Sequence, residues 1–104
     1  MVAKDPLLEC IGFDWDEANS AKNWERHRVT PEEAEDLFFH EPLVVCGDTV
    51  HSKGERRYQA LGQTAAGRLL FVAFTVRRKL IRVISARDMN QREAEEYQRH
   101  EKNS

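Results

Sequence analysis

Cysteine is scarce in this sequence. The 104 residues include two cysteines, Cys10 and Cys46, without a Cys-x-x-Cys pair, so neither a disulfide framework nor a zinc site of ordinary spacing is indicated. We expect both cysteines to be free thiols that pack as small apolar groups. His, Cys and carboxylate residues do not cluster at metal-ligand spacing, and we therefore expect no metal and no cofactor.

Long apolar segments are also lacking. The longest run, from Leu69 to Phe74, is far too short to cross a bilayer. The N-terminus has Lys4, Asp5 and Pro6 where a signal peptide would have an apolar core. The length suits one domain, so we expect a single domain over residues 1–104 that works in the cytoplasm and does not bind a membrane.

What the sequence does have is charge, divided unequally between its halves. Residues 1–50 hold 12 Asp/Glu and 4 Lys/Arg, whereas residues 51–104 hold 6 Asp/Glu and 12 Lys/Arg. Nine Lys/Arg and a single acid, Glu55, lie between Lys53 and Arg87 inclusive. This basic half indicates an anionic partner such as RNA or DNA, although basic strands paired with acidic helices of the same chain would give the same pattern. The overall net charge of −2 argues against a general nucleic-acid binder.

The first half of the sequence predicts a short strand and two helices. Residues 11–15 alternate apolar with small or polar residues, as a strand does. Asp16 is a suitable N-cap for a helix that runs to about Arg28. The sequence Thr30-Pro31-Glu32-Glu33 is a capping box that starts a second helix, which ends before Pro42.

The second half predicts mostly sheet. Turns at 65–67 and 77–79 join three of its strands into an antiparallel meander. Asn90 caps a last helix through about residue 100. The result is an α+β domain with its helices on one face of the sheet. The strands are expected at residues 43–46, 56–62, 68–76 and 80–86.

Several polar side chains suit the cleavage of RNA without a metal. A base removes the proton of a ribose 2′-hydroxyl, which attacks the adjacent phosphorus, while cations stabilise the phosphate and an acid protonates the leaving 5′-oxygen. His, Glu and Tyr can carry the protons, and the planar guanidinium of Arg donates two hydrogen bonds to a phosphate. The candidates are His27, His51, Glu55, Arg57, Arg82, Arg87 and Tyr97.

Each candidate also has a purely structural interpretation. His27 in the last turn of a helix can simply interact with the helix dipole, and His51 can be a solvated loop residue. Glu55 can neutralise its arginine neighbours, and Tyr97 can be a core aromatic with its hydroxyl at the edge. Residue type and position do not decide between the two interpretations.

Arg82 stands out because it interrupts an apolar strand that also contains Leu80 and Ile84. A half-buried arginine needs an anionic partner, either an acidic side chain of the N-terminal half or a substrate phosphate. Strict alternation puts Arg87 on the opposite face of the strand from Arg82. Both can line one site only if the strand ends or bulges before Arg87.

Four stretches of the sequence are informative in combination. They are Phe13-Asp14-Trp15-Asp16 with Asn23 and Arg26-His27-Arg28-Val29, then His51-Ser52 with Gly54-Glu55-Arg56-Arg57-Tyr58, then Gly67-Arg68-Leu69-Leu70-Phe71-Val72, and finally Ile81-Arg82-Val83-Ile84-Ser85-Ala86-Arg87 with Glu93 and Tyr97. In this order and spacing they resemble the BrnT toxin family of bacterial type II toxin–antitoxin systems. The resemblance covers about residues 11–98.

The resemblance implies a fold, an activity and a partner. The fold would be RelE-like, with helices packed against a twisted antiparallel sheet. The activity would be that of a ribonuclease toxin that inhibits translation by cutting RNA. The partner would be a BrnA-like antitoxin with a ribbon-helix-helix domain, so that DNA is contacted only indirectly through the antitoxin.

The polar positions that match the family become the best site candidates. We expect Glu55 or His51 to act as the base and His27 as the acid, with the arginines as phosphate clamps; fold analogy alone does not assign these roles. The expected catalytic set is His27, His51, Glu55, Arg57, Arg82 and Arg87. The expected RNA-binding set is Arg56, Arg77, Arg78, Lys79 and Tyr97.

The chain departs from the family pattern at three positions. Asn19 replaces a lysine that is common in the first helix, Arg26 replaces the usual lysine before the helix-end histidine, and Asp88 follows Ser-Ala-Arg where a basic residue is common. These changes motivate an alternative, a catalytically weak or inactive binding module that docks an antitoxin or RNA without cutting. Direct DNA binding is a further hypothesis, but the second helix is acidic and lacks Lys and Arg, so phosphate would repel it.

Overall fold

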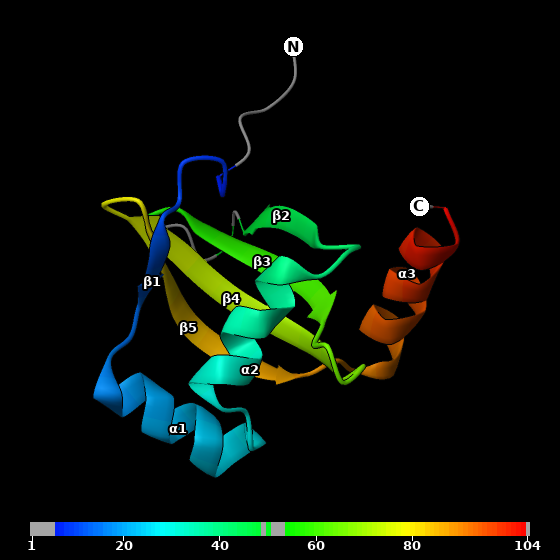
Figure 1. The fold of residues 1–104 in the computed structure, drawn as a ribbon, viewed down its shortest axis with the longest axis horizontal. Coiled ribbons are helices and arrows are strands. Elements are labelled where there is room, and N and C mark those ends of the chain that lie inside the picture. The colour runs from blue at the N-terminus through cyan, green and yellow to red at the C-terminus, as the bar shows by residue number, and fades with distance from the viewer. Residues whose placement is uncertain (1–5, 49, 51–53, 104) are drawn as a thin grey trace.

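A five-stranded sheet forms the centre of the computed structural model, which describes residues 6–48, 50 and 54–103 (Figure 1). Within the described residues, no helix has the length and apolar character that a membrane span requires. The elements in chain order are β1 (Gly12–Asp14), α1 (Glu17–His27), α2 (Pro31–Asp36), the 3-10 helix η1 (Leu37–Phe39), β2 (Val44–Asp48), β3 (Arg57–Gln63), β4 (Leu69–Arg77), β5 (Leu80–Asp88) and α3 (Gln91–Lys102).

The helices begin where the capping residues predicted them. The Asp16 side chain accepts a hydrogen bond from the Ala18 N–H at the start of α1. Complete capping boxes start the other two helices, formed by Thr30 with Glu33 and by Asn90 with Glu93. Each side-chain cap satisfies N–H groups that a helix start leaves without partners. The second helix is shorter than expected, because the chain tightens into η1 after Asp36.

The strand order in the sheet is β1-β5-β4-β3-β2. The antiparallel meander is confirmed, since β2, β3, β4 and β5 pair consecutively. The expectation of a purely antiparallel sheet is wrong, because β1 pairs with β5 in parallel, with Gly12 opposite Leu80 and Asp14 opposite Arg82. More than sixty residues separate β1 from β5 in the chain, so no hairpin turn dictates their relative direction.

The main core lies between the sheet and the two N-terminal helices. Figure 1 shows α2 crossing in front of the sheet, with α1 beside it. A cluster of buried apolar side chains joins these helices to the strands, and this burial provides most of the driving force for folding. The cluster consists of Val29, Ala34, Leu37, Ala60, Leu70, Val72, Phe74, Ile81, Val83 and Ala86.

Helix α3 packs on the other face of the sheet, so the expectation that all helices share one face is wrong. Leu61 is paired with Phe71, whose side chain points away from the main core because its neighbours Leu70 and Val72 point into it. Tyr97 of α3 is fully buried outside the main cluster, and its hydroxyl donates to the Pro42 carbonyl at 2.7 Å. A second, smaller apolar layer therefore holds α3.

A bulge in β5 changes which residues face each side of the sheet. Ala73 of β4 is paired with Ser85, whereas the next residue, Phe74, is paired with Val83. Ile84 is therefore an extra residue in β5, and the alternation shifts by one after it. This shift is the condition under which Arg82 and Arg87 can lie on the same face.

Candidate functional site

Helix α3 covers only part of the sheet face opposite α1 and α2. The uncovered part lies at the end of the sheet where β4 turns into β5. We call this part the open face. Its side chains alternate with those of the main core along each strand. The polar residues that the register places on it are Asp14, Asp48, Arg57, Thr75, Arg77 and Arg82.

One row of the open face crosses all five strands. Arg57 and Arg82 are each paired with Thr75, from opposite sides. Asp48 and Asp14 pair with these two arginines at the ends of the row. Adjacent strands lie about 4.8 Å apart, so the backbones of the two arginines are roughly 10 Å apart, and their flexible side chains can reach one phosphate.

Glu55 lies next to this row, two residues before the start of β3. Its carboxylate accepts two hydrogen bonds from Arg77, from Nε at 2.8 Å and from Nη2 at 2.9 Å. The hydrogen bond from Arg77 lowers the pKa of Glu55 below its ordinary value, and the charges of Arg82 and Arg57 lower it further. Glu55 is therefore an ionised carboxylate at neutral pH, surrounded by three guanidinium groups.

Two open-face arginines, Arg77 and Arg82, form ion pairs among the described residues, and Arg82 is the more loosely held. Its Nη1 lies 3.4 Å from Asp14 Oδ2, and its Nη2 lies 3.5 Å from Asp16 Oδ2. Both distances are longer than those of strong charge-assisted hydrogen bonds. The side chain keeps 28% of its surface exposed. A phosphate could therefore replace these carboxylates at little cost.

Arg87 shares this face with Arg82 but has a different environment. It makes a two-bond ion pair with Glu93 of α3, at 2.8 and 3.0 Å, and its guanidinium carbon lies 4.1 Å from the centre of the Phe71 ring. It lies five positions along the strand from Arg82, which corresponds to roughly 15 Å. Arg87 therefore links β5 to α3.

The two histidine candidates are not brought together with Glu55. His51 lies outside the described residues. His27 ends α1, where its backbone carbonyl accepts a hydrogen bond from Arg68 and its charge helps to lower the pKa of Asp88. Asp88 is six residues beyond Arg82 on β5, about 20 Å along the strand, so His27 is at the other end of the sheet.

Arg68 is the side chain at that end which the sequence analysis missed. It donates to Asp88, to Glu33 at 3.0 Å, and to the backbone carbonyls of His27 and Arg28. It thereby joins the end of α1, the start of α2 and the end of β5. Asp88, one of the three positions at which the sequence departs from the family pattern, is a partner of this arginine. No local pattern indicates such a role, since the partners are distant in sequence.

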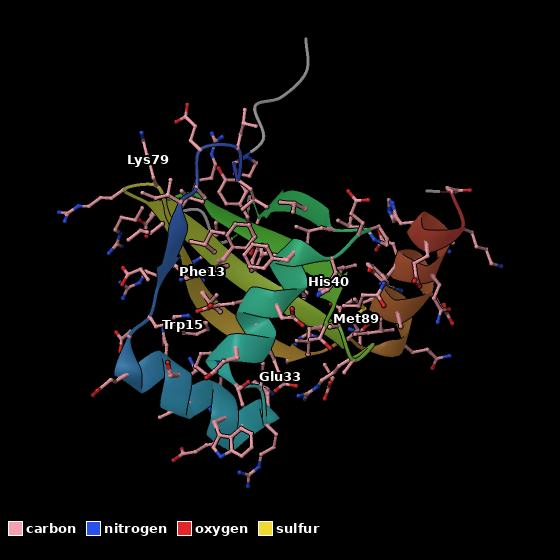
Figure 2. All side chains as sticks on the ribbon, in the orientation of Figure 1. Phe13, Trp15, Glu33, His40, Lys79 and Met89 are labelled. Carbon is pink, nitrogen blue, oxygen red and sulfur yellow. The ribbon has the colours of Figure 1, made fainter. Side chains whose placement is uncertain are left out.

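The expected RNA-binding residues are divided between surface and interior. Arg78 and Lys79 form the tip of the β4–β5 hairpin with φ values of 54° and 66°, and Figure 2 shows Lys79 there, beside the N-terminal turn. Arg56 is exposed, on the side of β3 opposite Arg57. Tyr97 is buried beneath α3, so its ring is not presented to solvent.

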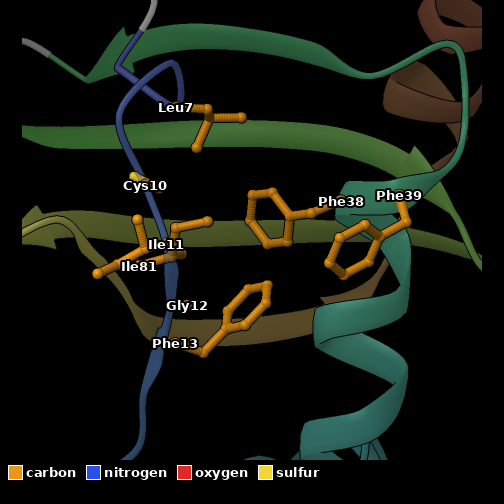
Figure 3. Close-up of a pocket in the computed structure, with 8 residues that line it drawn as sticks. All are labelled: Leu7, Cys10, Ile11, Gly12, Phe13, Phe38, Phe39 and Ile81. Carbon is orange, nitrogen blue, oxygen red and sulfur yellow. The ribbon is translucent and has the colours of Figure 1, made fainter.

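An apolar groove lies on the helical side of the molecule, between β1 and η1. Its volume is about 280 Å³, and Figure 3 shows Ile11 and Phe13 facing Phe38 and Phe39 across it. Ile11 is 80% exposed and Phe39 is 74% exposed, which is unusual for side chains of this size in one patch. The lining residues are Leu7, Cys10, Ile11, Gly12, Phe13, Phe38, Phe39 and Ile81.

The potential metal ligands among the described residues do not form a cluster. Across the part of the chain that the structure describes, no group of three or more His, Cys, Asp or Glu side chains is placed to hold a metal ion. Cys10 is half-buried with its thiol directed at the Pro6 carbonyl. Cys46 was expected to be packed, but it is exposed, because the edge strand β2 places it outside both apolar layers.

Comparison with known proteins agrees with this architecture. No curated protein sequence matches the chain. The crystal structure of the Brucella abortus ribonuclease toxin BrnT has a similar fold, with a TM-score of 0.60 and 21% sequence identity, over 78% of this chain and 99% of that one. The family described as "Ribonuclease toxin, BrnT, of type II toxin-antitoxin system" matches residues 15–93. Because this match spans most of the sequence, the chain belongs to the BrnT family of ribonuclease toxins.

Proposed function

We propose that this chain is the toxin of a type II toxin–antitoxin system, an endoribonuclease that cuts RNA without a metal ion and thereby inhibits translation in the cytoplasm. The observation that carries the proposal is the position of Glu55 among Arg57, Arg77 and Arg82 on the open face. A carboxylate that can accept a proton, next to several phosphate-binding guanidinium groups, is the arrangement that metal-free RNA cleavage requires.

Arg57 and Arg82 would bind the scissile phosphate. They flank Thr75 from neighbouring strands, so their guanidinium groups can approach one phosphate from two sides. When the 2′-oxygen attacks, the phosphate gains negative charge, and guanidinium groups already in place stabilise it without rearrangement. Asp14 and Asp16 hold Arg82 before the substrate arrives and would exchange with the phosphate.

Glu55 would accept the proton of the attacking 2′-hydroxyl. Its lowered pKa keeps it in the basic form over the whole physiological range, although it also makes the carboxylate a weaker base. His51, which the sequence predicts as the alternative base, lies outside the described residues, so that role stays a prediction. His27 has no part in this proposal, because it lies at the other end of the sheet.

The test is cleavage of a defined RNA by purified protein, with and without EDTA. We compare the wild type with Arg82→Ala and with the matched control Arg92→Ala, which removes an exposed arginine of α3. We expect cleavage with EDTA by the wild type and the control, and a loss of about a hundredfold or more for Arg82→Ala. Full activity of a folded Arg82→Ala variant would disprove the phosphate-binding role.

The alternative is a binding module that docks RNA or an antitoxin without cutting. One observation favours it: the side chains of Arg77, Arg82 and Arg87 are all in ion pairs with carboxylates of the same chain. If the wild type binds RNA but leaves it intact after long incubation, and expression in bacteria does not arrest growth, the binding module is the better account.

The antitoxin partner belongs to the same proposal. We assign a BrnA-like antitoxin segment to the apolar groove, because Ile11 and Phe39 expose large apolar surfaces there. The elements around the groove are acidic, with eight Asp/Glu and three Lys/Arg in residues 12–39. The segment that fits is therefore apolar with basic flanks.

A co-expression experiment tests this assignment. The double variant Ile11→Ser/Phe39→Ser should still arrest growth but escape neutralisation by a co-expressed BrnA-like antitoxin. Its matched control is Leu8→Ser, since Leu8 is 74% exposed but does not line the groove. Neutralisation of the double variant as complete as that of the wild type would rule out the groove.

A further inference from the structure

A second pocket lies at the same end of the sheet as the open face, but on the helical side. We call it the Tyr58 pocket. Its volume is about 380 Å³, within the range of small-ligand sites. The proposed catalytic chemistry does not use it. Its lining residues are Pro6, Glu9, Cys10, Arg56, Tyr58, Val76 and Lys79.

Two short chain segments, residues 56–57 and 77–79, connect the open face with the Tyr58 pocket. They place charged side chains on both sides of the sheet. Arg56 and Arg57 are consecutive, so they point to opposite sides, and Arg56 enters the Tyr58 pocket. On the neighbouring hairpin, Arg77 bonds Glu55 while Lys79 lines the pocket. A single strand of RNA that passes over this end of the sheet would therefore meet arginine or lysine side chains on both sides of it.

The Tyr58 pocket combines an aromatic ring with two positive charges. The Tyr58 ring is stacked on Phe74, with 5.4 Å between ring centres and 27° between planes, so its position is fixed by the core. Among the described residues, neither Arg56 nor Lys79 forms an ion pair with another side chain. This differs from Arg77, Arg82 and Arg87, which are all paired.

This combination matches the chemistry of a nucleotide. Bases pack against aromatic side chains, and the backbone phosphate interacts with Arg and Lys. Glu9, the one carboxylate of the lining, would disfavour a second phosphate in the pocket and could accept a hydrogen bond from an N–H group of a base. An acidic peptide has backbone N–H groups for Glu9 but no base to pack against the Tyr58 ring.

We propose that the Tyr58 pocket is a subsite for one nucleotide that flanks the scissile phosphate. This inference rests on the proposed function, because it places the cleaved phosphate on the open face. It adds a role for Tyr58 as a packing surface for the base and for Arg56 and Lys79 as ligands of that nucleotide's phosphate. The pocket would make cleavage depend on the length of the RNA.

Binding tests the subsite independently of cleavage. The probe is a fluorescent single-stranded RNA octamer with a 2′-O-methyl group on every ribose, which blocks attack by the 2′-oxygen. We expect Arg56→Ala and Lys79→Ala each to raise the dissociation constant about five- to tenfold beyond the effect of the control Arg92→Ala at the same ionic strength. A loss no larger than that of the control overturns the proposal.

Kinetics with two substrates separate the subsite from the catalytic groups. For an RNA octamer, Arg56→Ala should raise KM and leave kcat within about twofold. The preference for the octamer over a dinucleotide, as a ratio of kcat/KM values, should fall by about tenfold. Tyr58→Phe keeps the ring and should retain this preference, whereas Tyr58→Leu should lose part of it. An unchanged preference in Arg56→Ala and Lys79→Ala contradicts the subsite.

The two proposals fail in different ways. If the wild type cleaves no RNA but still binds the octamer through Arg56 and Lys79, the proposed ribonuclease function fails and the Tyr58 pocket stands only as a nucleotide-binding site. If the wild type cleaves RNA but these variants bind like the control, the subsite fails and the function stands. If Arg56→Ala and Lys79→Ala weaken the binding of a mixed Asp/Glu peptide as much as they weaken the binding of RNA, the occupant is an acidic protein and the nucleotide assignment is overturned.

Discussion

Arg82 and Arg87, five positions apart on β5, lie on the same face of the sheet because Ile84 is an extra residue between them. Without the bulge, an odd separation would put them on opposite faces. The two side chains nevertheless have different partners. Arg82 has two long contacts to Asp14 and Asp16, whereas Arg87 is held by Glu93 and Phe71.

The first prediction separates these two arginines. Arg87→Ala should lower the free energy of unfolding by about 1–2 kcal/mol, because it removes a two-bond ion pair between β5 and α3. Arg82→Ala should change stability by less than about 1 kcal/mol but lower the rate of RNA cleavage by about a hundredfold or more. Urea unfolding and cleavage rates measure the two effects. The division of roles is wrong if Arg82→Ala proves the more destabilising change.

The second prediction concerns the pH dependence of cleavage. The hydrogen bond from Arg77 is the largest cause that lowers the pKa of Glu55. A base works only when ionised, so the rate falls as the pH drops through this pKa. Arg77→Gln should raise the pKa of Glu55 toward its ordinary value of 4.5 and move the acidic limb of kcat/KM to higher pH.

The matched control for this prediction is Arg99→Gln, which removes an exposed arginine of α3 and should leave the limb in place. The position of the limb is the relevant measurement, since Arg77→Gln is also expected to weaken RNA binding. A limb that stays where it is in Arg77→Gln would mean that Glu55 is not the base.

The third prediction concerns Arg68. Its loss leaves two carboxylates and two backbone carbonyls without their donor, so Arg68→Ala should lower the free energy of unfolding by about 2–3 kcal/mol. Arg68→Lys should restore only part of this, because an ammonium group cannot reproduce the planar fork. Thermal unfolding monitored by circular dichroism provides the measurement, and a cost below that of Arg92→Ala would contradict the role.

The fourth prediction follows from the same group of residues. The hydrogen bond from Arg68 lowers the pKa of Asp88, whose ordinary value is 3.8. A carboxyl with a lowered pKa in the folded state contributes stability that is complete above its ordinary pKa and is lost as the pH falls through the folded pKa. Stability should therefore decrease below about pH 4 in the wild type. Asp88→Asn should show a smaller decrease over this range in urea unfolding measured at a series of pH values.

The fifth prediction concerns the hairpin tip. Arg78 and Lys79 both have positive φ, as a two-residue type I′ turn requires, and this costs non-glycine residues free energy. Replacing them by Asn-Gly should raise the free energy of unfolding by about 1 kcal/mol while weakening RNA binding. If the variant binds RNA as tightly as the wild type, the tip is not part of the RNA surface.

The local elements could be predicted well from the sequence. Capping boxes at Thr30 and Asn90 are complete within four residues, so they carry the information for a helix start without help from the rest of the chain. The apolar run of β4 and the turn after it likewise indicated a central strand in a meander. The predicted and observed boundaries of the elements differ by a few residues where the ends of helices tighten or fray, as at η1.

The candidate site could be predicted only in part. Glu55, Arg57 and Arg82 were chosen by residue type and family pattern, and the structure brings these three together with Arg77. His27 was chosen by the same reasoning but lies at the other end of the sheet. Distances between elements depend on strand order, and strand order is set by contacts between residues far apart in the chain.

By itself the sequence determined the helix starts, the meander, the division of charge and the membership of the BrnT family, because each depends on residue types at short or fixed spacing. The tertiary structure decided the parallel position of β1, the packing of α3 on the second face, and the bulge that aligns Arg82 with Arg87. These features depend on which apolar surfaces and backbone edges pair across long separations, where local propensity gives no preference. The open face and the Tyr58 pocket, on opposite sides of one sheet end, exist only through that pairing.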